Sequence, residues 1–401
     1  MVVGRARPPT PALPRPSPSW ADKFGHVVGV VHTNYLDYAA REEGGALKSA
    51  ALAVVNSALV RAHTHKAIKL SDAVQPLPRS VTEFVHGVPA AFLDVGRKRA
   101  AALERAHGGG GGWGSRFGRG RKSAAAPGPA ADASSRPASA TFARGAYFIG
   151  KAVWAKGYTE LLDLVEATAA DGGGGSDNKR SSSSSPSLAR VDCYGGGEDL
   201  PALRAAAAAR ALPLAFHGPR DHLDARMHDY RVLVNPSTSD VVATTTAEAL
   251  AMGKWVVVAD LPCNAWFGGF RNTLRYRTPA EFAGALRHAL AHDPHPVTAD
   301  EAAALSWEAA TQRFLDAAEL APGERPSGPA AAADRALYRA HNALTAVEQL
   351  RAAVGAGAGT RDAPPCLATW RPGAAASTGL FDRRGAGAAP RAARRAWLGG
   401  A

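Results

Sequence analysis

The sequence has few of the features that cross-link a chain or hold it in a membrane. Its 401 residues include only three cysteines, Cys193, Cys263 and Cys366, which lie far apart. Three such cysteines supply neither a disulfide framework nor the closely spaced ligands of a zinc site, so the sequence favours a reducing compartment. No run approaches the roughly 18 apolar residues that a membrane-spanning helix requires. The first residues contain several Pro and Arg but lack the apolar core of a secretory signal.

Signatures of several reaction types are missing as well. The chain has no Gly-x-Ser-x-Gly nucleophile turn, so hydrolase chemistry has no support. No Gly-Lys-Ser or Gly-Lys-Thr ends a glycine-rich loop, which excludes a standard phosphate-binding loop. The histidines His217, His222 and His228 have no carboxylate or cysteine at a standard ligand spacing. We therefore expect ordinary polar histidines and no metal site.

The basic charge does not indicate a nucleic-acid partner. The formal net charge is +12, but residues 1–26, 97–144 and 371–401 carry net +3, +8 and +5. The remaining sequence is therefore net −4 and has no basic stripe with interleaved aromatic residues. Basic charge concentrated on tails and linkers is typical of solvated segments, or of segments attracted to an anionic membrane surface.

Composition separates two foldable regions, residues 27–97 and 144–320, from low-complexity segments. Stretches rich in Pro, Gly, Ser or Ala bury too little apolar surface to offset the entropy of the chain. The predicted segments are a disordered N-terminus, a linker, an insert and an Ala/Gly/Arg-rich tail, at residues 1–26, 98–143, 171–187 and 321–401. An apolar stripe in the tail predicts one helix at residues 334–354.

Alternation of strands and helices predicts an α/β fold with parallel sheets. Apolar runs predict strands in the second region at 146–149, 190–194, 214–217, 232–235 and 255–259. Helical patterns follow them at 158–168, 199–212, 223–230 and 246–252, with closing helices at 279–292 and 300–318. The first region predicts strands at 27–31, 67–70 and 81–85 and one helix at 45–66, about half of a Rossmann-like domain.

Two acidic residues, Asp240 and Glu248, are the most informative feature of the chain. Asp240 follows the predicted strand at 232–235, and Glu248 comes after seven further residues, in the first turns of the next predicted helix. In an open parallel sheet such a loop borders the ligand crevice. Two carboxylates there suit a polyhydroxyl ligand, because its hydroxyl groups donate charge-assisted hydrogen bonds.

Two lysines, Lys151 and Lys156, flank the turn after the first strand of the second region. A helix amino terminus together with two ammonium groups can bind a pyrophosphate. Taken alone, such a pair is more typical of two solvated surface lysines. His32 directly follows another predicted strand, where a side chain can point into a cleft.

These residues and their surroundings resemble the retaining glycosyltransferases with two Rossmann-like lobes (the GT-B type), and among them the digalactosyldiacylglycerol synthases of plants and algae. The resemblance covers about residues 27–97 and 144–317. Its motifs, in the family's order, are 31–36, 84–88, 150–158, 235–260 and 305–314. The sequence departs from the family at Asp240, where Glu is usual. The family's opening strands and glycine-rich loop have no counterpart ahead of Val27, which implies a partial first lobe.

The resemblance implies an enzyme that transfers galactose from UDP-galactose to monogalactosyldiacylglycerol with retention of configuration. It implies no metal or other cofactor, and a peripheral position on the chloroplast outer envelope membrane. Two alternatives remain open from the residues. One is a glycosyltransferase with another acceptor, such as sucrose or a different lipid. The other is a non-catalytic protein that binds a nucleotide sugar.

The resemblance also assigns roles to single residues. Lys151 and Lys156 would bind the diphosphate, and Glu248 would bind the ribose. Asp240 and His32 would act at the transferred sugar. The remaining nucleotide-sugar contacts would come from Thr244, Thr245, Thr246, Gly195 and Gly197. Helix capping or turn formation is the alternative role for the threonines and for both acids.

Overall fold

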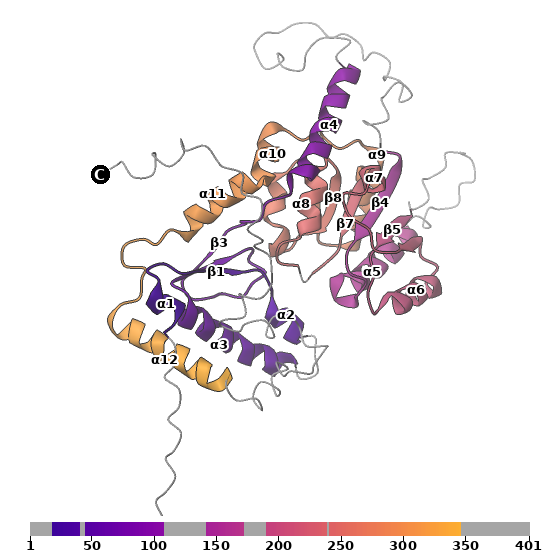
Figure 1. The fold of residues 1–401 in the computed structure, drawn as a ribbon. Helices are drawn as coiled ribbons and strands as arrows, with labels where there is room; N and C mark the ends of the chain where they lie inside the picture. Colours follow the sequence, from indigo (N-terminus) through magenta and orange to yellow (C-terminus); the bar gives the residue numbers. More distant parts are fainter. Residues whose placement is uncertain (1–17, 41–44, 108–141, 172–189, 239, 346–401) are drawn as a thin grey trace, which may run out of the picture. The chain divides into compact units, whose positions relative to one another are not determined.

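The computed structural model describes residues 18–40, 45–107, 142–171, 190–238 and 240–345. Ser17–Leu337 forms one compact unit, and of the described residues only 338–345 belong to a second. The elements that matter for the site all lie in the Ser17–Leu337 unit (Figure 1). Most of the predicted low-complexity segments, and Cys366, fall outside the described residues.

The second region forms a sheet of six parallel strands, as predicted, in the order β6-β5-β4-β7-β8-β9. The strands are β4 Arg144–Ile149, β5 Val191–Tyr194, β6 Leu214–His217, β7 Tyr230–Asn235, β8 Trp255–Ala259 and β9 Thr273–Tyr276. The sequence analysis did not predict β9, although its pairing with β8 completes the sheet. Strand order reverses between β4 and β7, which is the doubly wound arrangement.

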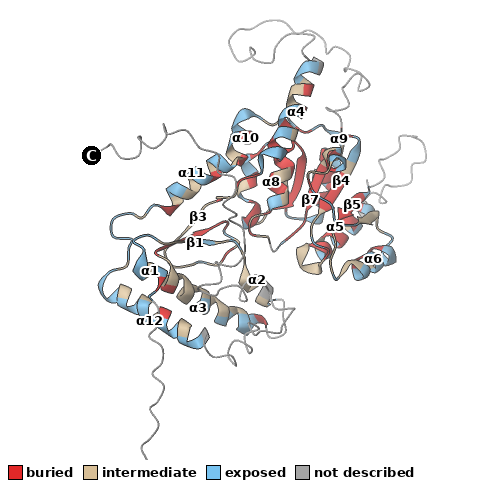
Figure 2. Ribbon diagram, viewed as in Figure 1, coloured by how far each residue is buried: buried red, intermediate tan, exposed pale blue. Residues whose placement is uncertain are grey.

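Helices cover both faces of this sheet, and each face has its own apolar core. The helices are α5 Tyr158–Asp171, α6 Leu200–Ala209, α7 Ala225–His228, α8 Thr244–Ala251, α9 Pro279–Ala291 and α10 Ala299–Leu305. The next helix, α11 Trp307–Ala318, packs instead against β2, Lys66–Lys69, of the first region. Leu161 of α5, Leu203 of α6 and Phe282 of α9 pack on one face. Leu250 of α8 and Leu305 of α10 pack on the other. Figure 2 shows the strands β4, β7 and β8 as buried.

A single helix predicted at 300–318 is two helices in the structure. Ser306 separates α10 from α11 in an extended conformation, and its side chain accepts a hydrogen bond from the amide of Ala309. The same residue forms an isolated parallel bridge with Val88. The break therefore occurs because Ser306 caps a new helix and pairs with a distant segment, which helical periodicity does not reveal.

The first region forms a smaller parallel sheet in the order β1-β2-β3. Its elements are α1 Trp20–Lys23, β1 Val28–Val31, α2 Tyr35–Ala40, α3 Gly45–His63, β2 Lys66–Lys69 and β3 Ser80–Thr82. The short helix α1 falls within residues predicted as disordered. Helix α3 leaves apolar side chains exposed, with Leu47 and Val54 at 81% and 71% of full exposure. In this sheet β2 is buried, whereas β1 and β3 are only partly buried.

Helix α4, Ala90–His107, differs from the predicted organisation. It runs well into the range predicted as a linker at 98–143, and it packs on α8 of the second region rather than on the first sheet. Phe92 and Leu93 belong to the same apolar core as Leu250. Gly96 allows the close approach, since a Cβ there would lie 2.0 Å from the carbonyl oxygen of Ala251. The tail helix α12, Gly328–Thr345, begins before the predicted start at 334, and residues 346–354 of that prediction lie outside the described residues.

A buried lysine ties the start of β7 to the end of α8. Lys254 is fully buried, and its ammonium group donates hydrogen bonds to the carbonyl oxygens of Met227 and Tyr230 and, at 3.4 Å, to that of His228. Burial lowers the pKa of Lys254 well below its usual value. Arg99 of α4 donates to the same His228 carbonyl at 2.7 Å, so two cations satisfy the acceptors of this turn.

We expect Lys254→Met to destabilise the fold by about 2 kcal/mol, because buried carbonyl groups then lose their donors. Urea unfolding followed by circular dichroism measures the change. Lys98→Met, on the exposed side of α4, is the matched control and should change stability by less than about 0.5 kcal/mol. Equal stability of the two variants would contradict the role given to Lys254.

Candidate nucleotide-sugar site

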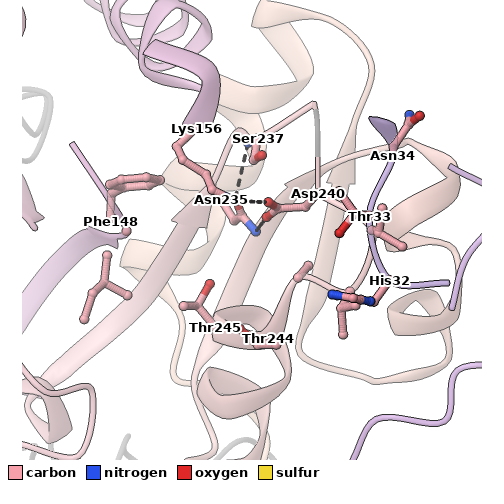
Figure 3. A pocket seen from close by; sticks show the side chains of 15 residues that line it. His32, Thr33, Asn34, Phe148, Lys156, Asn235, Ser237, Asp240, Thr244 and Thr245 are labelled. Atoms are coloured by element: carbon pink, nitrogen blue, oxygen red, sulfur yellow. Dashed lines mark hydrogen bonds and ion pairs between the residues drawn. The ribbon is translucent and has the colours of Figure 1, made fainter. Parts of the chain in front are cut away.

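A cavity of about 270 Å³ lies at the carboxyl ends of β4 and β7 (Figure 3). Its position is the point where the strand order reverses, which is where open α/β sheets bind ligands. Residues after β1 line it as well. The complete lining is His32, Thr33, Asn34, Phe148, Ile149, Gly150, Lys156, Asn235, Ser237, Asp240, Val241, Val242, Ala243, Thr244 and Thr245.

Lys156 and Asp240 meet in this cavity. The Lys156 ammonium group lies 2.9 Å from Asp240 Oδ1, and the side chains are 36% and 16% exposed. Lys156 ends the short helix η4, Trp154–Lys156, which Gly157 terminates in the left-handed conformation at φ 87°. A side chain at 157 would collide with Ser237, so glycine lets this turn approach the loop after β7.

Asn235 organises the floor of the cavity. Its side-chain nitrogen Nδ2 donates to Thr246 Oγ1 at 3.1 Å and lies 3.4 Å from Asp240 Oδ2. Its side-chain oxygen Oδ1 accepts from the backbone amide of Ser237. Figure 3 shows Asn235 beside Asp240 at the end of β7. The asparagine is 4% exposed, so its bonds hold the loop from within the protein.

The amino terminus of α8 faces the cavity. Ala243, with φ 47°, turns the chain into the helix, and Thr244 and Thr245 line the cavity. Thr246 is fully buried and accepts the hydrogen bond from Asn235, so its side chain supports the loop from below. The first amides of a helix carry partial positive charge and suit an anionic group.

Glu248 does not line this cavity; it lies one turn further along α8, in contact with His222. His222 Nδ1 is 2.7 Å from Glu248 Oε2, and His222 Nε2 is 2.7 Å from the hydroxyl group of Tyr147. Burial lowers the pKa of His222, although Glu248 opposes this shift. The two predicted acids thus occupy different surroundings, with Asp240 facing a lysine and Glu248 facing a histidine.

Lys151, Gly195 and Gly197 lie outside the cavity lining. Lys151 is 61% exposed and pairs with Glu198 at 3.4 Å. A Cβ at Gly195, which has φ 153°, would lie 1.8 Å from the Gly150 carbonyl oxygen, and one at Gly197 would lie 2.3 Å from that of Ala152. The glycines therefore let the loops after β4 and β5 pack together, and the predicted contacts to nucleotide stay predictions.

His32 follows β1 directly, as predicted, and lines the cavity beside Thr33. Its side chain is exposed. The cavity thus brings together five of the predicted site residues, which are His32, Lys156, Asp240, Thr244 and Thr245.

The sequence model of a family described as "Glycosyl transferases group 1" matches residues 145–292, the segment that contains β4 to β9 and α8. This segment is a group 1 glycosyl transferase domain. The α/β fold predicted for it is confirmed by the parallel six-stranded sheet.

The chain around the group 1 domain is similar to named plant proteins. It is 40% identical over 364 residues to Digalactosyldiacylglycerol synthase 1, chloroplastic, of Glycine max, covering 86% of this chain and 41% of that protein. It is 39% identical over 301 residues to Digalactosyldiacylglycerol synthase 2, chloroplastic, of Arabidopsis thaliana, covering 75% and 54%. The chain therefore spans between about two fifths and half the length of these relatives.

Among solved structures, the chain is similar to HepE of Anabaena in complex with UDP. The two are 12% identical with a TM-score of 0.45, and the similarity covers 72% of this chain and 71% of that one.

Within its described residues, the chain has no helix long and apolar enough to cross a membrane and no cluster of three or more potential metal ligands. Cys193 and Cys263 are buried free thiols, and burial raises the pKa of Cys263 to about 11.

Sequence analysis missed three residues of the group 1 domain that hold the site together, which are Asn235, His222 and Tyr147. Asn235 is the last residue of an apolar strand and precedes Asp240 by five positions. A polar side chain at that end of the strand is a signal that could have identified it. His222 was considered only as a metal ligand. Tyr147 is an aromatic residue within a buried strand, which by itself predicts core packing.

We expect Gly195→Ala to destabilise the domain by at least about 1 kcal/mol, because the added methyl group meets the Gly150 carbonyl. Thermal unfolding in the absence of ligand measures this. Gly218→Ala is the matched control, since nothing lies within 4 Å of the position of its Cβ. If both variants melt at the same temperature, the close packing of the two loops is not required.

Proposed function

We propose that the chain is the donor-binding part of a retaining galactosyltransferase that makes digalactosyldiacylglycerol from UDP-galactose and monogalactosyldiacylglycerol. The observation that carries the proposal is the Lys156–Asp240 ion pair beside the α8 amino terminus, inside a group 1 domain. The names of the plant relatives support the galactolipid product and a chloroplast location. A peripheral position on the outer envelope membrane extends this proposal.

In the proposed donor complex, Lys156 and the amides of Thr244 and Thr245 bind the diphosphate of UDP. Lys156 is 36% exposed, so solvent screens its ion pair with Asp240, and such a partly exposed pair contributes on the order of 1 kcal/mol. A diphosphate carries more negative charge than one carboxylate, so it can displace Asp240 from the lysine at little cost. The released Asp240 carboxylate is then available to accept hydrogen bonds from the transferred sugar. We also assign Lys151, on the same loop after β4 as Lys156, to the diphosphate.

In the proposed transfer step, the bond between the sugar C1 and the diphosphate oxygen breaks. The acceptor hydroxyl oxygen forms the new bond to C1 on the same face, and its proton passes to the departing diphosphate. Lys156 and the α8 amides stabilise the charge that grows on UDP, an electrostatic role that needs no metal. His32 and Asp240, from the two sides of the cavity, orient the sugar.

The remaining predicted residues complete the donor site. Glu248 accepts hydrogen bonds from the ribose hydroxyl groups through its free carboxylate oxygen. Gly195 and Gly197 shape the loop after β5 that borders the nucleotide. Thr246 keeps Asn235, and through it Asp240, in place.

Lys156→Met is expected to weaken binding of UDP by roughly tenfold or more and binding of uridine by less than twofold, because uridine has no diphosphate. Isothermal titration calorimetry with both ligands measures the difference. Lys98→Met, on the exposed side of α4, is the control. Equal losses for UDP and uridine would show that Lys156 supports the fold instead of the phosphates.

Glu248→Gln is expected to impair ligand binding, whereas Asp240→Asn is expected to impair galactose transfer. Glu248→Gln should weaken both UDP and uridine by about 1–3 kcal/mol, the range for a hydrogen bond to a charged group. Asp240→Asn should leave UDP affinity within about threefold and lower galactose transfer by at least tenfold. Transfer is measured with radiolabelled UDP-galactose and monogalactosyldiacylglycerol in liposomes, with and without EDTA.

The same assay tests the proposal as a whole. Digalactolipid formed by the wild type, at equal rates with and without EDTA, is the expected result. A labelled product formed instead from sucrose or another lipid would show that this compound, and not monogalactosyldiacylglycerol, is the acceptor. UDP binding without any product from the whole set of acceptors would overturn the transferase in favour of a nucleotide-sugar-binding protein.

A further inference from the structure

A buried chain of three side chains runs from β4 to α8. The hydroxyl group of Tyr147 and Oε2 of Glu248 each lie 2.7 Å from one ring nitrogen of His222. Tyr147 is completely buried and His222 is 6% exposed, whereas the Glu248 side chain is 19% exposed. The chain therefore connects the core of the group 1 domain to a carboxylate that solvent or a ligand can reach.

The donor and the acceptor can be assigned for each hydrogen bond among these three side chains. An ionised carboxylate only accepts, so His222 Nδ1 must be the donor to Glu248. A neutral imidazole with its proton on Nδ1 accepts at Nε2, and the Tyr147 hydroxyl then donates to it. Among the described residues, His222 is the only partner of that hydroxyl group. Burial lowers the pKa of His222 and raises that of Tyr147, so both stay neutral and this proton arrangement holds at neutral pH.

The surroundings of His222 hold the ring in one place. Phe92 of α4 packs against it with ring centres 5.6 Å apart, as does Tyr147. The loop that carries His222 is fixed by Asp221, which accepts from the amide of Leu223 at 2.9 Å. The ring therefore has little freedom to leave Glu248, and it occupies one carboxylate oxygen. Glu248 Oε1 has no hydrogen-bond partner among the described residues.

We propose that His222 is a positioning residue that orients Glu248 toward the ribose of a uridine nucleotide. This inference rests on the proposed function, because it gives Glu248 the ribose as its ligand. Oε2 is held by His222, whose ring is anchored by Tyr147, and Oε1 is left to accept from the ligand. Without His222 the carboxylate must be ordered by the ligand itself, and the cost of that ordering weakens binding.

Two substitutions of His222 by amide residues test its hydrogen bonds to Glu248 and to Tyr147 separately. In His222→Asn the amide nitrogen takes the place of Nδ1 and can still donate to Glu248. In His222→Gln the longer side chain places its amide near the position of Nε2, where it can bond with Tyr147 but not with Glu248. We expect His222→Gln to weaken UDP and uridine by on the order of tenfold, about 1.4 kcal/mol, and His222→Asn by less than threefold.

A double variant distinguishes positioning from general destabilisation. If His222 acts through Glu248, adding His222→Gln to Glu248→Gln should weaken UDP less than twofold further. Thermal unfolding of every variant is recorded, and His288→Gln, exposed on α9, is the control. Equal UDP affinity for His222→Gln and wild type would overturn the inference, as would full additivity in the double variant. Failure of the wild type to bind UDP would instead overturn the proposed function.

Discussion

The direct pairing of β4 with β7 is the constraint on which the rest of the structure depends. Arg144, Ala146 and Tyr147 pair with Tyr230, Val232 and Leu233, and from this central pair the chain winds outward in both directions. The loops after the two strands must therefore diverge and leave an opening between them. The second region lines the cavity from the ends of these two strands, from η4 and from the segment that leads into the first turn of α8.

Polar groups around the site fall into two kinds that differ in burial. Asn235, His222 and Lys254 are almost fully buried, and each is bonded to partners on other segments. A buried polar group without a partner costs about 1–3 kcal/mol, so these contacts determine local geometry. Lys156 and Lys151 are much more exposed, and their ion pairs are weak enough to exchange for a ligand. The buried groups thus fix the loops, and the exposed lysines on those loops can exchange their ion pairs for a ligand.

Much of the fold could be predicted because buried parallel strands are continuous apolar runs. All five strands predicted in the second region begin and end within two residues of the observed ones, and Leu214–His217 and Trp255–Ala259 coincide with their predictions. The misses share a cause. Helix α4 is stabilised by contacts with α8, the helix break at Ser306 by a bridge to Val88, and β9 by pairing with β8. None of these distant partners leaves a local pattern.

In the site, the order of residues along the chain indicates which chemical groups stand at the ends of strands. Asp240, Lys156 and His32 were predictable because a polar residue after an apolar strand must lie at the edge of the sheet. The packing of the elements against one another determines which of these groups meet. It paired Asp240 with Lys156, and it placed Glu248 beside His222 instead of in the cavity. The reason is physical: the spacing of residues along a strand or helix specifies a face, whereas a hydrogen-bond partner from another element depends on how the elements pack.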